Sequence, residues 1–136
     1  MYETFDHTAD LGLRIQAADL NRLFGEAGQA LFSAIVANPQ VIELVQEVRF
    51  SVAAERVDDL LHDWLAELLF TFDSRRLLFG RFDVHMSETN LVATAYGEVF
   101  DPLRHELRME IKAITYHGLK LEQTANGWLA EVIVDI

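Results

Sequence analysis

The chain contains no cysteine, so its composition excludes disulfides, thiolate zinc sites and cysteine nucleophiles. This absence fits a reducing compartment. No apolar stretch approaches the roughly 18 residues of a membrane span, and no charged segment followed by an apolar run opens the sequence. We therefore expect a cytoplasmic protein with no membrane attachment.

Basic residues are also scarce, and Lys112 and Lys120 are the only lysines. The chain has 11 Lys and Arg against 22 Asp and Glu, which gives a formal net charge of −11. Strong direct binding to nucleic acid is not expected, because it depends mainly on Lys and Arg neutralising phosphates. A chain this acidic is better suited to binding cations or to docking on a basic surface of another protein.

Motifs of the common enzyme classes are missing as well: there is no P-loop, no glycine-rich dinucleotide turn, no G-x-S-x-G elbow and no H-E-x-x-H helix. The histidines are dispersed, with no pair at helical spacing, so we expect them to bond to backbone groups or to face water. His62, which stands among acidic residues of a predicted helix, is expected to face water. The five histidines are His7, His62, His85, His105 and His117.

Two apolar stripes at helical spacing predict the principal helices. The first covers residues 20–35, with Asp19 as its N-cap and Asn38-Pro39 ending it. The second runs from Val57 to about residue 75. Gly25 and Gly28 lie inside the first helix and cost about 1 kcal/mol each relative to alanine, for which close packing against a sheet would be a reason.

Alternating apolar and polar residues predict strands over most of the remaining chain. Two helices with a majority of antiparallel strands define an α+β fold, in which the helices cover one side of the sheets. At 136 residues, 51% of them hydrophobic, the chain is expected to form a single domain over residues 1–136. The predicted strands cover residues 2–7, 11–16, 48–54, 77–86, 91–99, 107–116, 119–124 and 128–136.

Candidate chemistry lies at the two extremities of the sequence. Asp10 follows the first predicted strand, and by itself it is explained by an Asx turn. The final run EVIVDI predicts a strand that would hold Asp135 and the Ile136 carboxylate in a sheet. If the sheet brought these anions together, each pair at about 5 Å would repel by about 3 kcal/mol at an effective dielectric of about 20. Such a corner either stays wet and loose or holds a hard cation such as Ca²⁺, Mg²⁺ or Mn²⁺.

Two further residues are candidates for a functional role. Lys112 opens the predicted strand KAITYHG, where it would either neutralise a nearby acid or solvate a sheet edge. His7 flanks the first turn and is a candidate for ordering it.

Four blocks of the sequence together resemble the archease family over essentially the full length. They are FDHTADLGL, DLLHDWLAELLFTFD, GEVFDPLRHE followed by IKAITYHGLKL, and the terminal VIVDI. The resemblance implies two interlocked strand-helix-strand-strand modules. It also implies a protein cofactor of the RtcB-type RNA ligase rather than an enzyme. That ligase joins an RNA 3′-phosphate or 2′,3′-cyclic phosphate to a 5′-hydroxyl with GTP and Mn²⁺ in tRNA splicing and RNA repair, and the cofactor is expected to promote its guanylylation and multiple turnover.

The resemblance also implies a site. Asp10 matches the aspartate of the H-T-A-D block, and Asp135 with Ile136 matches the terminal D-I pair. In the family these positions bind a divalent cation, with calcium expected in structures and Mn²⁺ or Mg²⁺ in function. Lys112 matches the lysine of the K-A-x-T block. A stand-alone metal-dependent phosphoesterase and a small-molecule or chaperone-like binding module are the alternative functions.

Overall fold

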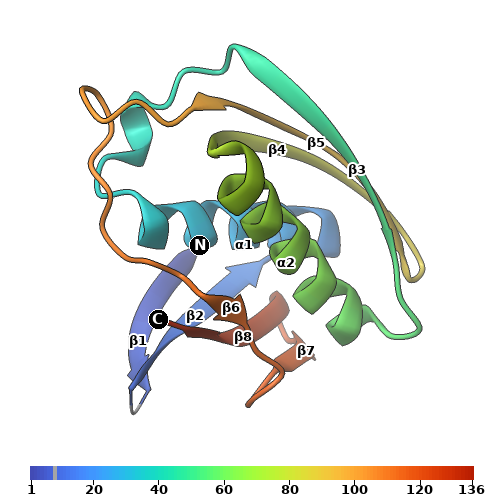
Figure 1. Ribbon diagram of the computed structural model, residues 1–136. Helices are drawn as coiled ribbons and strands as arrows, with labels where there is room; N and C mark the ends of the chain where they lie inside the picture. The colour runs from blue at the N-terminus through green and yellow to red at the C-terminus, as the bar shows by residue number, and fades with distance from the viewer. Residues whose placement is uncertain (8) are drawn as a thin grey trace.

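The computed structural model describes residues 1–7 and 9–136, without the side chain of His7. The chain folds into two antiparallel sheets and two principal helices (Figure 1). The strands are β1 Tyr2–His7, β2 Asp10–Ala17, β3 Gln46–Ala53, β4 Leu77–Ser87, β5 Asn90–Val99, β6 Ala113–Ile114, β7 Lys120–Thr124 and β8 Gly127–Asp135. The helices are α1 Leu20–Ile35, the 3₁₀ turn η1 Pro39–Val41, and α2 Val57–Arg75.

Local signals in the sequence define the ends of both helices. The Asp19 carboxylate caps α1 by accepting a hydrogen bond from the backbone N–H of Arg22 at 2.8 Å, as predicted. Asp58 and Asp59 lie in the first turn of α2, where negative charge suits the helix dipole. At its C-terminal end Arg76 adopts the left-handed conformation with φ of 57°, and its N–H donates to the carbonyl of Phe72.

Both helices lie between the two sheets and cover one face of each (Figure 1). α1 packs against β4 of one sheet and β2 of the other, and α2 contacts β3 and β6 in the same way. Trp64 of α2 is fully buried, and its indole N–H donates to the Phe24 carbonyl of α1 at 2.9 Å. The α+β class with two principal helices is therefore confirmed. Neither helix in the described part of the chain has the length and hydropathy to cross a membrane.

The order of strands explains how the two halves interlock. The three-stranded sheet has the order β3-β5-β4 and is built with α2 from one continuous segment in the order β3-α2-β4-β5. The five-stranded sheet has the order β1-β2-β8-β6, and β7 also pairs with β8. The same strand-helix-strand-strand order recurs there as β2-α1-β7-β8, interrupted by the first module. The middle of the sequence is thus inserted into a unit built from its two ends.

The predicted strand over residues 107–116 is largely wrong, because only Ala113 and Ile114 pair as a strand. The preceding residues cross from the three-stranded sheet to the five-stranded sheet. Along this crossing they bond to α1, where the N–H of Arg108 donates to the Ile35 carbonyl at 2.8 Å. An extended segment that passes between two sheets has no continuous neighbour to form a ladder with, although its side chains alternate as in a strand.

The two helical glycines differ in the space around them. A methyl group at Gly28 would lie 2.9 Å from the ring of Phe82, whereas at Gly25 the nearest neighbour would be 3.7 Å away. Phe82 cannot retreat freely, because its ring packs on Phe32 and Trp64. Close packing against a sheet therefore explains Gly28 and leaves Gly25 unexplained.

We expect Gly25→Ala to raise the free energy of unfolding by about 0.5–1 kcal/mol, because it improves helix propensity without a clash. Gly28→Ala is expected to lower it by about 1–3 kcal/mol through overpacking. Urea denaturation of the two variants provides the measurement, and each variant serves as the other's control. Equal stabilisation by both would show that Phe82 does not confine the helix.

Candidate functional site

The antiparallel pairing of β2 with β8 places two of the predicted site residues at one end of adjacent strands. The ladder runs from Ala17↔Trp128 to Leu11↔Val134. Asp10 is the first residue of β2 and Asp135 is the last of β8, one step beyond that final pair. The two carboxylates therefore come from opposite ends of the sequence to the same end of one sheet.

A third strand brings Lys112 to the same corner. Ala113 of β6 pairs with Asp135, and the backbone N–H of Lys112 donates to the Asp135 carbonyl at 2.7 Å. Ile136 follows Asp135, and its half-buried side chain packs against the hydrophobic core. Asp10, Asp135, Ile136 and Lys112 thus gather at one end of three neighbouring strands. We call these four residues the terminal corner.

The side-chain alternation of the strands orients the terminal corner. Leu11 and Val134 are buried on the helix-covered face, so Asp10 and Asp135, one residue further on, point toward the outer face. Both aspartates are half-buried.

Phe5 covers Gly12 on that outer face, because a methyl group at Gly12 would lie 2.2 Å from the Phe5 ring. Further along β2, Arg14 forms ion pairs with Glu3 at 2.9 Å and with Glu131 at 2.7 Å. Hydrogen bonding to these two carboxylates raises the pKa of Arg14. Arg14 thus has its own acidic partners within this sheet.

The donor set at the terminal corner consists of oxygen atoms, which hard divalent cations prefer. Among the described residues, no group of three or more His, Asp or Glu side chains is arranged to hold a metal. The ligand roles of Asp10, Asp135 and Ile136 remain predictions. The side chain of His7 lies outside the described residues.

His62 was expected to face water, and this expectation is wrong. Its side chain is only 12% exposed, and Nε2 lies 2.9 Å from the carbonyl oxygen of Ile114. The ring stacks on Tyr116 with centroids 3.7 Å apart, and Nδ1 lies 2.9 Å from a carboxylate oxygen of Asp63. His62 therefore fixes the strand next to Lys112 against α2. The prediction failed because a helical pattern reports only neighbours on the same helix. Tyr116 and Ile114, which cover His62, come from another part of the chain.

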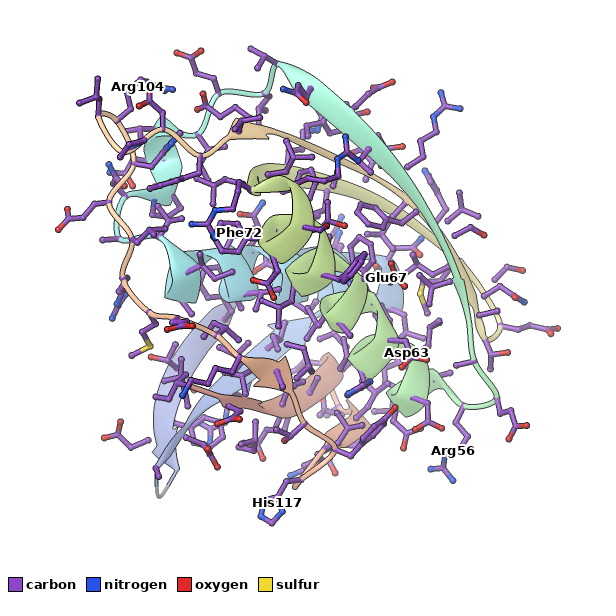
Figure 2. The ribbon with its side chains drawn as sticks, in the orientation of Figure 1. Arg56, Asp63, Glu67, Phe72, Arg104 and His117 are labelled. Atoms are coloured by element: carbon purple, nitrogen blue, oxygen red, sulfur yellow. The ribbon has the colours of Figure 1, made fainter. Side chains whose placement is uncertain are left out.

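A second cluster of charged groups is buried in the loop region that follows β5. Its centre is Glu98, whose carboxylate accepts hydrogen bonds from Arg104 at 2.5 Å, from His105 Nε2 at 3.0 Å and from the N–H of Glu43 at 2.6 Å. His105 Nδ1 accepts from the N–H of Asp101 at 2.9 Å, which assigns the proton to Nε2. Both ring nitrogens are thus in use. Figure 2 shows Arg104, a member of this cluster, on the loop that follows β5.

This cluster explains the block GEVFDPLRHE as a structural element. The described contacts of Glu98 and His105 are all internal, so they tie the loop to the end of β5 and to the segment after η1. Burial raises the pKa of Glu98, but the hydrogen bonds from Arg104, Glu43 and His105 outweigh it and hold the pKa at about 2. In the sequence this block indicated only the family resemblance, and the buried network was not predicted.

The Glu98 network makes stability depend on acid pH. Because the folded-state pKa of about 2 lies below the ordinary value of 4.5, the contribution is complete above about pH 4.5 and is lost as the pH falls toward 2. We expect Glu98→Gln to lower the free energy of unfolding at pH 7 by about 1–3 kcal/mol, since an amide cannot accept all three donors. Urea denaturation at several pH values should show the gap between variant and parent narrowing below pH 4.5.

Glu47→Gln is the matched control for this measurement, because Glu47 is an exposed strand residue. Its effect should stay within about 0.5 kcal/mol at every pH. A gap for Glu98→Gln that does not change with pH would contradict the ionised network.

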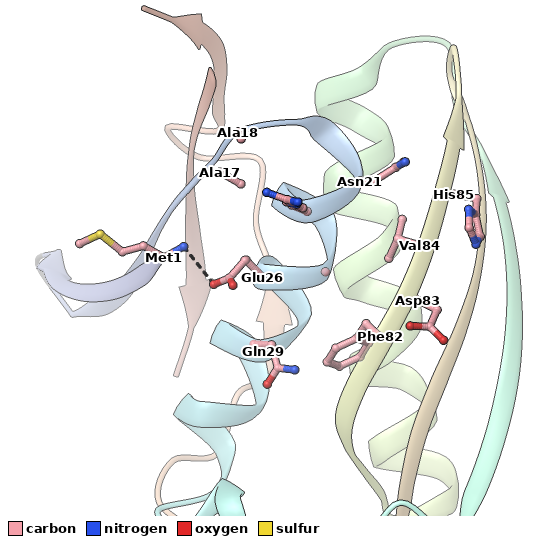
Figure 3. Close-up of a pocket in the computed structure, with 12 residues that line it drawn as sticks. Met1, Ala17, Ala18, Asn21, Glu26, Gln29, Phe82, Asp83, Val84 and His85 are labelled. Atoms are coloured by element: carbon pink, nitrogen blue, oxygen red, sulfur yellow. Dashed lines mark ion pairs between the residues drawn. The ribbon is translucent and has the colours of Figure 1, made fainter. Parts of the chain in front are cut away.

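The described cavities lie apart from the two aspartates. One of about 700 Å³ is lined by residues of α1 and β4 (Figure 3). At this cavity the amino group of Met1 forms an ion pair with Glu26 at 3.1 Å. Another of about 580 Å³ lies between α2 and the crossing segment 107–112, and Lys112 is at its edge. Asp10 and Asp135 line neither of these two cavities, whereas Lys112 of the terminal corner lines the second.

Comparison with known proteins gives a consistent result along the whole chain. A profile described as the Archease protein family matches residues 2–136. The protein archease of Pyrococcus furiosus is 40% identical over 140 residues, which cover 99% of this chain and 98% of the relative. Protein archease of Sulfurisphaera tokodaii is 36% identical over 137 residues, with the same coverage of both chains.

Two solved structures share the fold. The solution structure of a Methanobacterium thermoautotrophicum protein superposes with a TM-score of 0.88 at 35% identity, covering 99% of this chain and 98% of that one. The crystal structure of an archease from Thermotoga maritima, described as a possible chaperone, gives a TM-score of 0.66 at 22% identity, covering 100% and 98%. At that lower identity the likeness shows a common fold alone.

Proposed function

Since this chain belongs to the archease family, we propose that it is an accessory protein that activates an RtcB-type RNA ligase in tRNA splicing and RNA repair. In this role it promotes the GTP-dependent guanylylation of the ligase and its multiple turnover. The Thermotoga maritima relative is described as a possible chaperone, which also suits action on another protein. The net charge of −11 favours docking on a basic surface of the ligase.

The observation that carries this proposal is the register of β2 against β8. It sets Asp10 and Asp135 at the same strand end, beside Lys112 and Ile136. Asp10, Asp135 and Ile136 match the positions that bind a cation in the family, and Lys112 matches the lysine of the K-A-x-T block. If the resemblance were accidental, the four matched residues would be expected to lie scattered over the fold. They lie together instead, on or next to three neighbouring strands.

In the proposed mechanism, the carboxylates of Asp10, Asp135 and the Ile136 terminus would hold one divalent cation, with Ca²⁺, Mn²⁺ and Mg²⁺ as the candidates. Such an ion would supply positive charge of the kind that GTP phosphates require. The protein's own contribution is positional. The pairing of β2 with β8 aligns the two aspartates, and His62 holds the adjoining strand so that Lys112 stays beside them.

A stand-alone phosphoesterase receives less support from the same geometry. The rings of His62 and His105 both have their nitrogens bonded internally. His85 lies on β4 of the other sheet. None of these three histidines is positioned as a general base next to the terminal corner. Incubating the purified protein alone with Mn²⁺ and RNA ends tests this alternative, since processing of those ends without ligase would support it.

The terminal corner is tested by Asp10→Asn and Asp135→Asn, which remove charge with little change in shape. We expect each variant to weaken Ca²⁺ and Mn²⁺ binding at least about tenfold and to abolish stimulation of the cognate ligase. Calorimetric titration measures the first effect, and a multiple-turnover ligation assay measures the second. The free energy of unfolding should change little, because both side chains are half-buried and lie at the ends of their strands.

Asp83→Asn is the matched control, because Asp83 is an aspartate on β4 of the other sheet, paired with Arg81. It should leave cation binding and ligase stimulation unchanged. Unaltered ligase turnover with Asp135→Asn would remove the corner from the mechanism. A variant that no longer binds the cation but still stimulates the ligase would show that activation does not require the ion.

A further inference from the structure

The cavity of about 580 Å³ beside the crossing segment differs in charge from the rest of this acidic protein. Its apolar floor includes Phe72 of α2 and Ile111. Arg76, Arg108 and Lys112 line it, together with Asp73 and Glu110. Three of the eleven basic residues therefore surround one groove. We call it the basic groove.

The basic side chains of the groove share one property with Arg49 and Arg75: they form no ion pair with a described residue. Within the described residues no ion pair involves Arg76, Arg108 or Lys112. Six other basic side chains do pair with carboxylates, as expected in a chain with twice as many acids as bases. Those six are Arg14, Arg22, Arg56, Arg81, Arg104 and Lys120.

Arg76 is held in place by aromatic rings. Its guanidinium carbon lies 4.5 Å from the ring centroid of Phe72 and 5.4 Å from that of Phe100. Figure 2 shows Phe72 near the C-terminal end of α2, where the helix dipole also favours a cation. A guanidinium that packs through its face keeps the N–H donors on its edge for another group. Its fork is therefore ordered in advance and has no carboxylate partner in the described chain.

We propose that the basic groove binds the phosphate groups of a nucleotide, either free or at the end of an RNA. The planar fork of arginine matches phosphate oxygens, and three cations suit a ligand with more than one negative charge. A volume of about 580 Å³ accommodates a ligand of nucleotide size, and the apolar floor suits a base or ribose.

Asp73 and Glu110 restrict the ligand that the groove can take. Together with the net charge of −11, they disfavour a long polyanion that passes over the surface, so a short phosphorylated group is preferred. This inference needs neither the ligase nor a cation at the terminal corner. The test accordingly uses the protein alone, and it changes groove residues that lie outside the corner.

Calorimetric titration at low salt with GTP, inorganic pyrophosphate and a short RNA bearing a 3′-phosphate tests the proposal. We expect saturable binding of at least one probe, weakened about tenfold by Arg108→Gln and again by Arg76→Gln, since each variant removes a charge-assisted contact. Arg76→Lys retains the charge but loses the fork, so it should bind more weakly than the parent. Comparison of the RNA with its 3′-hydroxyl counterpart, and of RNA with GTP, distinguishes the two sources of phosphate.

Arg49→Gln is the matched control, because Arg49 on β3 is an exposed arginine outside the groove, with no ion pair among the described residues. It should leave the affinity unchanged, and thermal melting should show that all variants fold. The proposal is overturned if no probe binds saturably, or if Arg49→Gln weakens binding as much as Arg108→Gln. Failure here would leave the ligase proposal intact, since that rests on the aspartates.

Discussion

The pairing of β2 with β8 is the interaction on which the rest of this structure depends. It joins the two extremities of the described sequence in the middle of the five-stranded sheet, with β1 on one side and β6 and β7 on the other. Strand pairing between such distant segments must overcome a large loop-closure entropy, which the buried apolar faces of both strands offset. Asp10 and Asp135 take their places from this register, and Lys112 joins them through the pairing of β6 with β8.

Two sets of polar contacts anchor the segment that crosses from one sheet to the other. His62 fixes the end of the crossing segment to α2, and the Glu98 network fixes its beginning to β5. Between these two points the chain runs over α1 without a continuous strand partner. The basic groove lies along this stretch, so its shape is set by side chains that are anchored at both ends and not by regular secondary structure.

The sequence predicted the local elements well, because their signals are local. Asp19 caps α1 as expected, and the period-two pattern identifies β2 and β8 almost residue by residue. The crossing segment was mistaken for a strand, since alternation reports which side chains are buried and not whether a neighbouring strand exists. Residues that meet across the fold were invisible for the same reason. The partners of His62 and Glu98 depend on contacts that no periodicity encodes. The same is true of the basic side chains that gather near Phe72 without an ion pair to any described residue.

The terminal corner is different, because its membership was proposed from the sequence while its proximity was not deducible from the residues. Asp10 alone fits a turn and Asp135 alone fits a strand end. The residues alone left their proximity open, the matched blocks suggested that they act together, and the register now supplies a reason for them to lie together.

Because the terminal corner is built from the two ends of the sequence, ligand binding there is linked to the cooperative unfolding of the whole fold. A ligand held between the ends of β2 and β8 requires that ladder to be intact, and opening the ladder disrupts the centre of the sheet. Partly unfolded forms that keep only β3, α2, β4 and β5 have no such site. Bound ligand would therefore stabilise the native state as a whole, and its effect would appear in global unfolding and not in local fraying.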